Sequence, residues 1–249
     1  MNQSFYTGAV GASQQLKRLN IHGDNIANLN TMGFKANRAD FTALLYQNHK
    51  GIDAQLPMGV GTRLLMTSKD NSQGPVEDFG RILDYMIEGD GFFALVDLTT
   101  GEVTYTRNGA FTKSGREMPT GEVDQNGDPV TELTYFLGDD EGRFVLSDVG
   151  GLIEVPDGNS IDPLPIGIFD YINYDGMTQI DDTRYLPVDK NGNLIYGTGQ
   201  LRQGVVEGSN ADLAEEYTKV IESQRAYGLA LKMVQTSDEI ETTINNLRT

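Results

Sequence analysis

The sequence lacks the residues on which several kinds of site depend. Its 249 residues include no cysteine, no tryptophan and only two histidines. Without cysteine there is no disulfide framework, no thiolate zinc site, no iron–sulfur cluster and no cysteine nucleophile. No apolar run reaches the roughly 18 to 20 residues that a membrane-spanning helix needs. The first twenty residues lack the basic-then-apolar order of a cleaved signal peptide, so we expect any export to use another route.

Acidic residues dominate the charge, and they are unevenly distributed. The chain has 19 Lys and Arg against 36 Asp and Glu, a net charge of −17, which is a poor match to nucleic-acid phosphate. Residues 51–208 carry 10 of these basic and 27 of these acidic side chains, so this segment holds the entire net charge. It also holds all 8 prolines and 24 of the 29 glycines, the residues that break helices and form turns. The pattern predicts two helical ends around a turn-rich middle, and no nucleic-acid partner.

The familiar patterns of catalytic and metal-binding residues are missing. His22 and His49 have no second histidine four positions away, and we interpret both as solvated side chains. Two runs, 124–128 and 189–193, place side-chain oxygens at alternate positions, but they lack the glycine and glutamate positions of a calcium-binding EF-hand loop. Asn-Gly hairpin turns explain both runs better. The sequence therefore predicts no catalytic residue, no cofactor and no metal ligand.

The N-terminal segment has the spacing of a helix that packs along a narrow seam. Apolar or small residues recur at steps of four and three, and we predict a helix over about residues 4–28. Asn28, Asn30 and Gly33 then favour helix termination. The predicted seam residues are Phe5, Ala9, Ala12, Leu16, Leu19 and Ile26.

The C-terminal segment shows the same spacing over a greater length. Ser209 followed by Asp212 resembles a capping box and predicts a helix start there. About 35 residues of helix would be roughly 50 Å long, a length typical of rods and bundles. The predicted seam residues are Leu213, Tyr217, Val220, Gln224, Tyr227, Leu231 and Val234.

The two helices most simply pair with each other as a coiled coil. Neither seam is rich in large residues, because one contains two alanines and the other a glutamine, so we expect further copies of the chain to cover the remaining faces. An ordinary two-helix bundle attached to a β domain is the alternative. Gln14, Arg18, Gln224 and Arg225 are candidates for contacts between subunits or with a central channel, and solvation of a polar face explains them equally well.

The middle of the chain predicts an antiparallel β domain. Turn dipeptides such as Asn108-Gly109 and Asn191-Gly192 separate short strand candidates, and no helical segments alternate with them. The expected strands cover 92–97, 103–107, 144–146, 166–171 and 193–196. The predicted fold class is α+β, with a helical domain formed by 1–34 and 210–249, an extended linker over 35–72, and a β domain over 73–209.

Three stretches resemble a known family. Residues 25–35 are similar to the N-terminal signature of bacterial flagellar rod and hook axial proteins, and 203–210 with 224–227 resemble its C-terminal elements. Residues 87–93 with 105–111 resemble the opening of its β domain. The matching terminal positions are Asn25, Ala27, Asn28, Thr31, Gly33, Phe34, Lys35, Gln203, Gly204, Glu207, Ser209, Asn210, Gln224, Arg225 and Tyr227.

The resemblance implies a structural subunit without catalytic activity. Members of this family pair their terminal helices, stack them with those of neighbouring copies into a hollow helical filament, and leave the cell through the flagellar type III export apparatus. The implied partners are further copies, other rod and hook subunits, and bushing ring proteins. The implied location is the extracytoplasmic basal body of the flagellum.

Two alternatives to a rod subunit of the distal type stay open. Residues 41–46 and the intact Gln224–Tyr227 element favour the distal type over a proximal rod paralogue or a hook-type protein of the same family. A secreted β-domain enzyme or carbohydrate-binding protein is an alternative of a different class, and only the acidic loops suggest it.

Overall fold

A computed structural model describes residues 3–43, 47–49, 56–58, 62–123, 129–156, 163–174 and 176–247. Its contacts divide the chain into two units. The helical unit comprises Met1–Leu29, Ala36–Asp70 and Ala211–Thr249, and the β unit comprises Asn30–Lys35 and Asn71–Asn210. The run 124–128, considered above for calcium, and residues 44–46 of the tract that favours the distal rod type lie outside the described residues.

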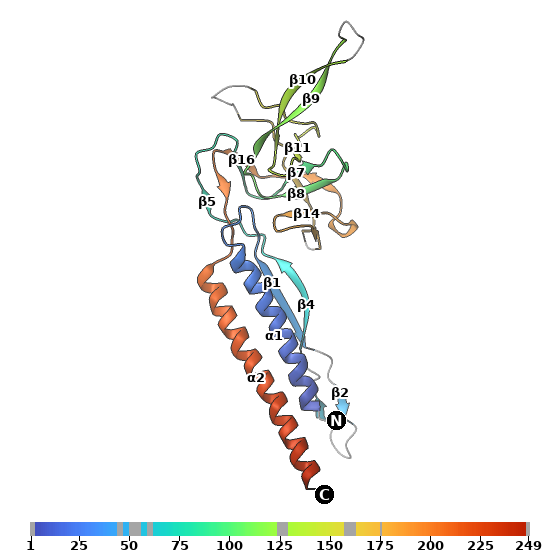
Figure 1. Cartoon of the computed structure of the whole chain (residues 1–249), viewed down its shortest axis with the longest axis vertical. Helices are drawn as coiled ribbons and strands as arrows, with labels where there is room; N and C mark the ends of the chain where they lie inside the picture. The colour runs from blue at the N-terminus through green and yellow to red at the C-terminus, as the bar shows by residue number, and fades with distance from the viewer. Residues whose placement is uncertain are drawn as a thin grey trace. The chain divides into compact units, whose positions relative to one another are not determined.

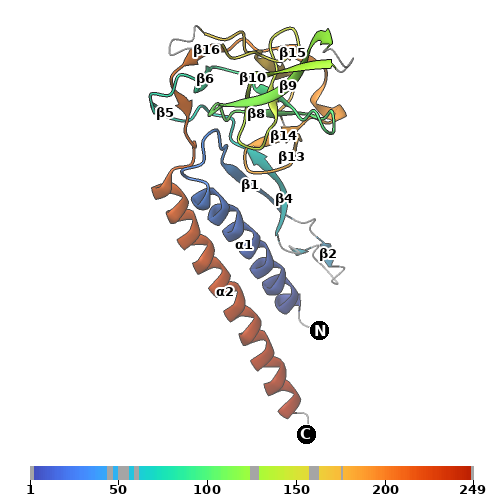
Figure 2. The same cartoon turned by 45° about the horizontal axis from the view of Figure 1, so that its top comes forward.

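Two long helices dominate the helical unit, as the sequence predicted. Helices α1 (Gln3–Ala27) and α2 (Leu213–Asn246) lie side by side in both views (Figures 1 and 2). They are antiparallel, because Ser4 lies against Ser237 while His22 lies against Glu216. The predicted α+β class with paired terminal helices is confirmed.

Helix α2 begins three residues later than the predicted capping box. Asp212 is its N-cap, with extended backbone and a carboxylate that accepts hydrogen bonds from the backbone N–H groups of Ala214 and Glu215. These two N–H groups have no partner within the helix, so the bonds stabilise its first turn. Ser209 instead belongs to the β unit, where it is buried.

The segment predicted as an extended linker contains paired strands. Strand β1 (Asn37–Ala43) pairs antiparallel with β4 (Thr62–Lys69), and β2 (Gln47–His49) pairs antiparallel with β3 (Leu56–Met58). The β1–β4 register shifts between Asp40 and Phe41, and both strands contact α1. The sequence gives little sign of this pairing, because the two long strands are joined by no turn dipeptide.

The β unit is built on a seven-stranded antiparallel sheet. Its strand order is β13-β14-β8-β7-β11-β10-β9, and three further pairs, β5 with β17, β6 with β16, and β12 with β15, complete the unit. The bounds are β5 (Val76–Glu77), β6 (Tyr85–Glu88), β7 (Phe93–Val96), β8 (Val103–Thr106), β9 (Thr112–Val123), β10 (Pro129–Gly138), β11 (Phe144–Val145), β12 (Phe169–Tyr171), β13 (Thr178–Gln179), β14 (Arg184–Leu186), the 3-10 helix η1 (Asp189–Asn191), β15 (Leu194–Tyr196), β16 (Gln200–Gln203) and β17 (Val206–Glu207).

Apolar clusters cover both faces of this sheet near its centre. Phe93 and Leu95 belong to one cluster, while Ala94 of the same strand and Tyr105 of β8 belong to the other. Successive side chains of a strand point to opposite faces, so one short strand supplies both. The predicted strands around β7, β8, β11 and β15 are present, and the predicted strand 166–171 is present over its second half as β12. The long β9–β10 pair was not predicted, and of its two strands β9 has few apolar residues.

Candidate assembly site

The contact between α1 and α2 is made mostly by small and polar side chains. Ser4 Oγ lies 3.1 Å from Ser237 Oγ. A Cβ added at Gly8 would lie 3.0 Å from Val234 Cγ2 and 3.3 Å from the Ala230 carbonyl oxygen. The helix backbones therefore approach closely at this point, and a larger residue at position 8 would not fit without movement of its neighbours.

This close approach corrects the intrachain seam predicted from the heptad pattern. Leu16, Leu213, Tyr217 and Leu231 are exposed, and so is Phe5 at 38%. The observed contact face keeps Ala12 of the predicted seam, which is buried, but is rotated towards Gly8, His22, Glu216, Ser223 and Ser237, which are also buried. The predicted residues Leu19, Ile26, Val220, Tyr227 and Val234 are partly buried, and Ala9 and Gln224 are exposed. Small side chains let the helices come together, and most of the larger apolar residues consequently remain outside the intrachain contact.

His22 lies in this contact and is not the solvated side chain that was predicted. It is 4% exposed, and its Nδ1 lies 2.6 Å from Glu216 Oε2. Burial alone would raise the pKa of the Glu216 carboxyl, but hydrogen bonds with Lys219, His22 and Asn25 outweigh burial and the pKa is lowered. Glu216 is therefore a buried carboxylate held in its charged form. The side chain of His49 lies outside the described residues.

Two asparagines of the N-terminal signature organise the end of α1. The Asn25 side chain donates to the Asn37 carbonyl oxygen at 2.9 Å and accepts from the Asn37 N–H at 2.8 Å, so it binds the first residue of β1 as a neighbouring strand would. The Asn28 amide donates to the Asp24 carbonyl oxygen at 3.1 Å, within the last turn. Ala27, between them, is exposed.

The polar residues proposed for contacts between subunits lie near or outside the helix contact. Gln224 and Arg225 are exposed and Gln14 is half-buried. Arg18 Nη2 lies 3.7 Å from Glu222 Oε2 on α2. An exposed ion pair of this kind contributes little to stability, and a role of these four residues in contacts between subunits stays a prediction.

Within the β unit, the two terminal signatures meet at a buried carboxylate. Glu207 is 1% exposed. Its Oε1 accepts from Lys35 Nζ at 2.5 Å and from the Gly74 N–H at 2.8 Å, and its Oε2 accepts from Arg107 Nη1 at 3.3 Å. Lys35 Nζ also donates to the Ser72 carbonyl oxygen at 2.7 Å. The carboxylate is thus matched by two cations and a backbone donor, as a buried charge requires.

The backbone around this carboxylate is equally constrained. Gly33 donates its N–H to the Glu207 carbonyl oxygen at 2.7 Å. Its φ is +72°, and a Cβ there would lie 2.3 Å from the Asn108 nitrogen, so only glycine fits. Phe34, next in the chain, is completely buried. Asn210 Nδ2 donates to the Ser72 carbonyl oxygen at 3.1 Å.

Three further signature positions, Gln203, Gly204 and Thr31, also lie in the β unit. Gln203 Nε2 donates to the Ile82 carbonyl oxygen at 2.9 Å, and Gly204, at φ +84°, donates its N–H to the Asp84 carbonyl oxygen. Thr31 lines the cavity described next. Arg107 was not among the predicted functional residues, although it lies within the third stretch, 105–111, that resembles the family.

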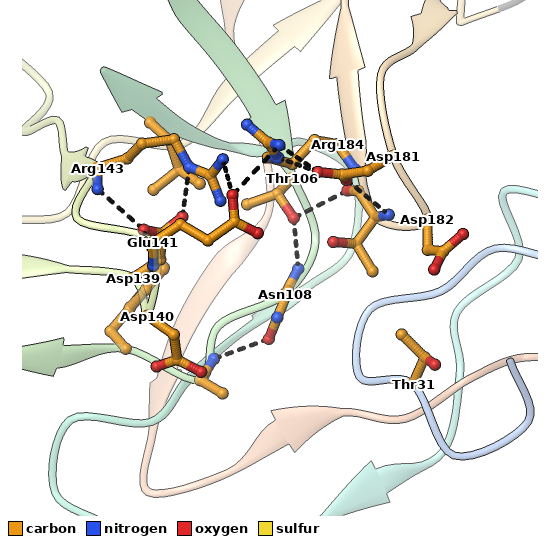
Figure 3. Close-up of a pocket in the computed structure, with 14 residues that line it drawn as sticks. Thr31, Thr106, Asn108, Asp139, Asp140, Glu141, Arg143, Asp181, Asp182 and Arg184 are labelled. Atoms are coloured by element: carbon orange, nitrogen blue, oxygen red, sulfur yellow. Dashed lines mark hydrogen bonds and ion pairs between the residues drawn. The ribbon is translucent and has the colours of Figure 1, made fainter. Parts of the chain in front are cut away.

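A polar cavity of about 270 Å³ opens on the β unit (Figure 3). Arg143 Nη1 lies 2.6 Å from Glu141 Oε2, and Arg184 Nη2 lies 3.5 Å from the same oxygen. Arg143 also binds Asp139, and Arg184 binds Asp181. This chain of alternating charges ties the β10–β11 loop to the segment before β14. Within the described ranges no group of three or more His, Cys, Asp or Glu side chains is placed to hold a metal ion.

Comparison with known families matches about three quarters of the chain in three parts. Residues 5–35 match the model described as flagella basal body rod protein, residues 86–196 match the flagellar hook protein FlgE/F/G D1 domain, and residues 202–247 match the flagellar basal body rod FlgEFG protein C-terminal. These ranges contain the three stretches on which the sequence resemblance rested. Neither helix of the described chain is long and apolar enough to cross a membrane.

Similar proteins span the full length of the chain. The flagellar basal-body rod protein FlgG of Buchnera aphidicola subsp. Schizaphis graminum is 32% identical, with 96% of this chain and 97% of that protein covered. Its namesakes in Borreliella burgdorferi and Bacillus subtilis are each 31% identical, with at least 99% of each chain covered. The chain therefore belongs to the flagellar basal-body rod protein family, whose members are structural and not enzymatic.

Proposed function

We propose that this chain is a rod subunit of the distal type that assembles through its terminal helices into a hollow shaft and transmits torque to the hook. Residues 1–34 and 210–249 form the assembly domain in this proposal. Full-length similarity to proteins named FlgG supports the type of subunit. The apolar surface that α1 and α2 leave exposed supports the mode of assembly.

The exposed apolar residues of the two helices carry the proposal. Burying such a side chain completely is worth roughly 1.5–3 kcal/mol, and many exposed together usually mark an interface. Neighbouring copies can bury them, because residues 1–50 and 209–249 have nearly balanced charges in contrast to the acidic middle. They are Phe5, Tyr6 and Leu16 on α1 and Leu213, Tyr217, Ile221, Leu229, Leu231, Met233, Ile240 and Ile244 on α2.

The proposal also assigns partners and a location. Copies of the chain, other rod and hook subunits, and bushing ring proteins would contact the subunit in the extracytoplasmic basal body. The flagellar type III export apparatus would deliver it there without a cleaved signal peptide. The acidic middle segment would lie on the outside of the shaft, where its charge opposes nonspecific association.

Substitution of the exposed apolar residues tests this function. Leu16→Ser with Leu231→Ser should abolish assembly of the purified chain into tubes, as followed by sedimentation and electron microscopy. The same variant should fail to restore motility to cells that lack their own copy. The matched control is Val149→Ser, which changes an equally apolar, 87% exposed residue of the β unit and should assemble normally. Tube formation by the double variant would contradict assembly through these faces.

A further inference from the structure

Helix α2 extends past the start of α1. Ser237 lies against Ser4, the second residue of α1, and α2 continues from there to Asn246. At about 1.5 Å per residue, these last nine residues add roughly 13 Å of helix. Both views show this end of α2 continuing beyond α1 (Figures 1 and 2). We call residues 238–247 the C-terminal arm.

Every residue of the C-terminal arm is exposed. Three of them are large and apolar, and Leu247 is 82% exposed. Ile240, Ile244 and Leu247 follow one another at steps of four and three, so they lie on one side of the arm. The earlier part of α2 buries one side against α1, and helices in proteins draw most of their stability from such packing. Within the described chain, the apolar side of the arm has no such cover.

The charges of the two helices show which surface complements the arm. Residues 238–249 contain three acidic side chains and one basic one. The part of α1 from Gln3 to Gly23 contains two basic side chains and no acidic one, whereas the part of α2 from Leu213 to Ser237 contains three of each. Complementary charges favour one partner surface over another. Of the two helices, α1 therefore complements the acidic arm.

The exposed side of α1 also offers an apolar contact. Phe5, Ala9 and Leu16 are exposed and follow one another at steps of four and seven, so they lie on one side of the helix. Lys17, next to Leu16, is exposed as well. An apolar stripe with a positive charge beside it thus faces outwards on α1. Because the arm extends past the α1 of its own chain, the α1 that receives it belongs to a second copy.

We propose that the C-terminal arm of one copy docks on the exposed side of α1 of a second copy. Ile240, Ile244 and Leu247 pack against the apolar stripe of that α1, and the acidic residues of the arm lie near its Lys17. Two different surfaces meet, so the same contact can repeat from copy to copy, as an open filament requires. The inference rests on the assembly proposed above and names the surfaces that join one copy to the next.

Exchange of charges in the full chain tests the docking. Lys17→Glu reverses the charge beside the receiving stripe, and Glu239→Lys/Glu241→Lys makes the arm basic. Each variant alone brings like charges together, and we expect the concentration needed for assembly to rise at least about tenfold at low ionic strength. The chain that carries all three substitutions should assemble within about threefold of the parent concentration, because opposite charges meet again. All three positions are exposed, so the helix content should not change.

Lys232→Glu, at an exposed lysine of α2, is the matched control for Lys17→Glu. Combined with Glu239→Lys/Glu241→Lys, it should leave assembly as weak as in the arm variant alone. Restoration of assembly by Lys232→Glu would overturn the assignment of the receiving surface to α1. Failure of Lys17→Glu to restore assembly would overturn docking of the arm beside this lysine.

Mixing the variants separates the docking proposal from the assembly proposal. In an equal mixture, the basic arm of the Glu239→Lys/Glu241→Lys chain meets the reversed charge of the Lys17→Glu chain, while the acidic arm of the latter meets the lysine of the former. Sedimentation velocity should show complexes in this mixture that neither chain forms alone, and their absence would overturn docking. A parent chain that forms no tubes would overturn the assembly proposal, whereas docking is still decided by the mixture.

Discussion

Lys35 and Glu207, which are 172 positions apart in the sequence, form an ion pair of 2.5 Å between Nζ and Oε1 inside the β unit. Lys35 closes the N-terminal signature, and Glu207 lies in the C-terminal one. Both side chains are at most 3% exposed. The two signatures are therefore joined by a buried contact, which gives the family resemblance at these positions a physical cause.

Replacing one member of this pair should destabilise the β unit. Lys35→Met leaves the Glu207 carboxylate buried with Arg107 and the Gly74 N–H as its remaining partners, and we expect a loss of about 3–5 kcal/mol. Urea unfolding followed by near-ultraviolet circular dichroism measures this loss. Lys113→Met, at an exposed lysine of β9, is the control and should change stability by less than about 0.5 kcal/mol. Equal stabilities for the two variants would show that the buried pair is not important.

Gly33 should tolerate no side chain, for two separate reasons. A Cβ would meet the Asn108 nitrogen at 2.3 Å, and φ is +72°. Gly33→Ala should therefore cost more than about 2 kcal/mol, combining backbone strain with steric overlap. Gly80→Ala has a similar φ of +66° with open space around its Cβ, and strain alone should cost about 1 kcal/mol. The difference between the two unfolding free energies isolates the overlap, and the absence of a difference would contradict it.

The sequence predicted the two helices and the class of the middle segment because their signals are local. Heptad spacing marks α1 and α2, and short alternating runs between turn residues mark the strands, although the Asn191-Gly192 run that was predicted as a hairpin turn contains the 3-10 helix η1. Such patterns do not show how far apart two helices pack. The apolar residues Leu16 and Leu231 belonged to the predicted intrachain seam, whereas glycine at position 8 and serine at positions 223 and 237 bring the small faces together and leave these leucines exposed.

Local patterns could not predict contacts between residues that are distant in the sequence. His22 was predicted to be solvated because nothing near it in the sequence is a suitable partner, yet Glu216 is its neighbour in space. Strands β1 and β4 were missed for the same reason. Resemblance to a family placed Lys35 and Glu207 among the important residues, but it did not indicate that they bind each other or that Arg107 joins them.

Enlarging Gly8 should weaken the pairing of α1 with α2. Gly8→Leu places a side chain where even a Cβ would be 3.0 Å from Val234, and overpacking of this kind costs roughly 1–3 kcal/mol. Gly23→Ala adds a methyl group in the same helix with nothing within 4 Å and should stabilise by roughly 0.5–1 kcal/mol, because alanine favours helix. Amide hydrogen exchange along α1 measures both effects. Slower exchange in both variants would indicate that helix propensity, and not the contact with α2, determines protection, because leucine and alanine both favour helix over glycine.

The carboxylate of Glu216 should make the helix pair sensitive to acid. Its pKa is lowered in the folded chain from an ordinary value of 4.5, so the unfolded chain binds this proton at higher pH than the folded chain does. The stabilisation is fully present above about pH 4.5 and is lost as the pH falls through the lower pKa of the folded state. Urea unfolding followed by circular dichroism at 222 nm, between pH 6 and pH 3, measures the decline.

The Glu216→Gln variant should start from lower stability at pH 6 and decline less below pH 4.5. The control Glu222→Gln, at an exposed position of the same helix, should follow the parent curve. Parallel curves for the parent and Glu216→Gln would mean that this carboxyl has the same proton affinity in the folded and unfolded chains.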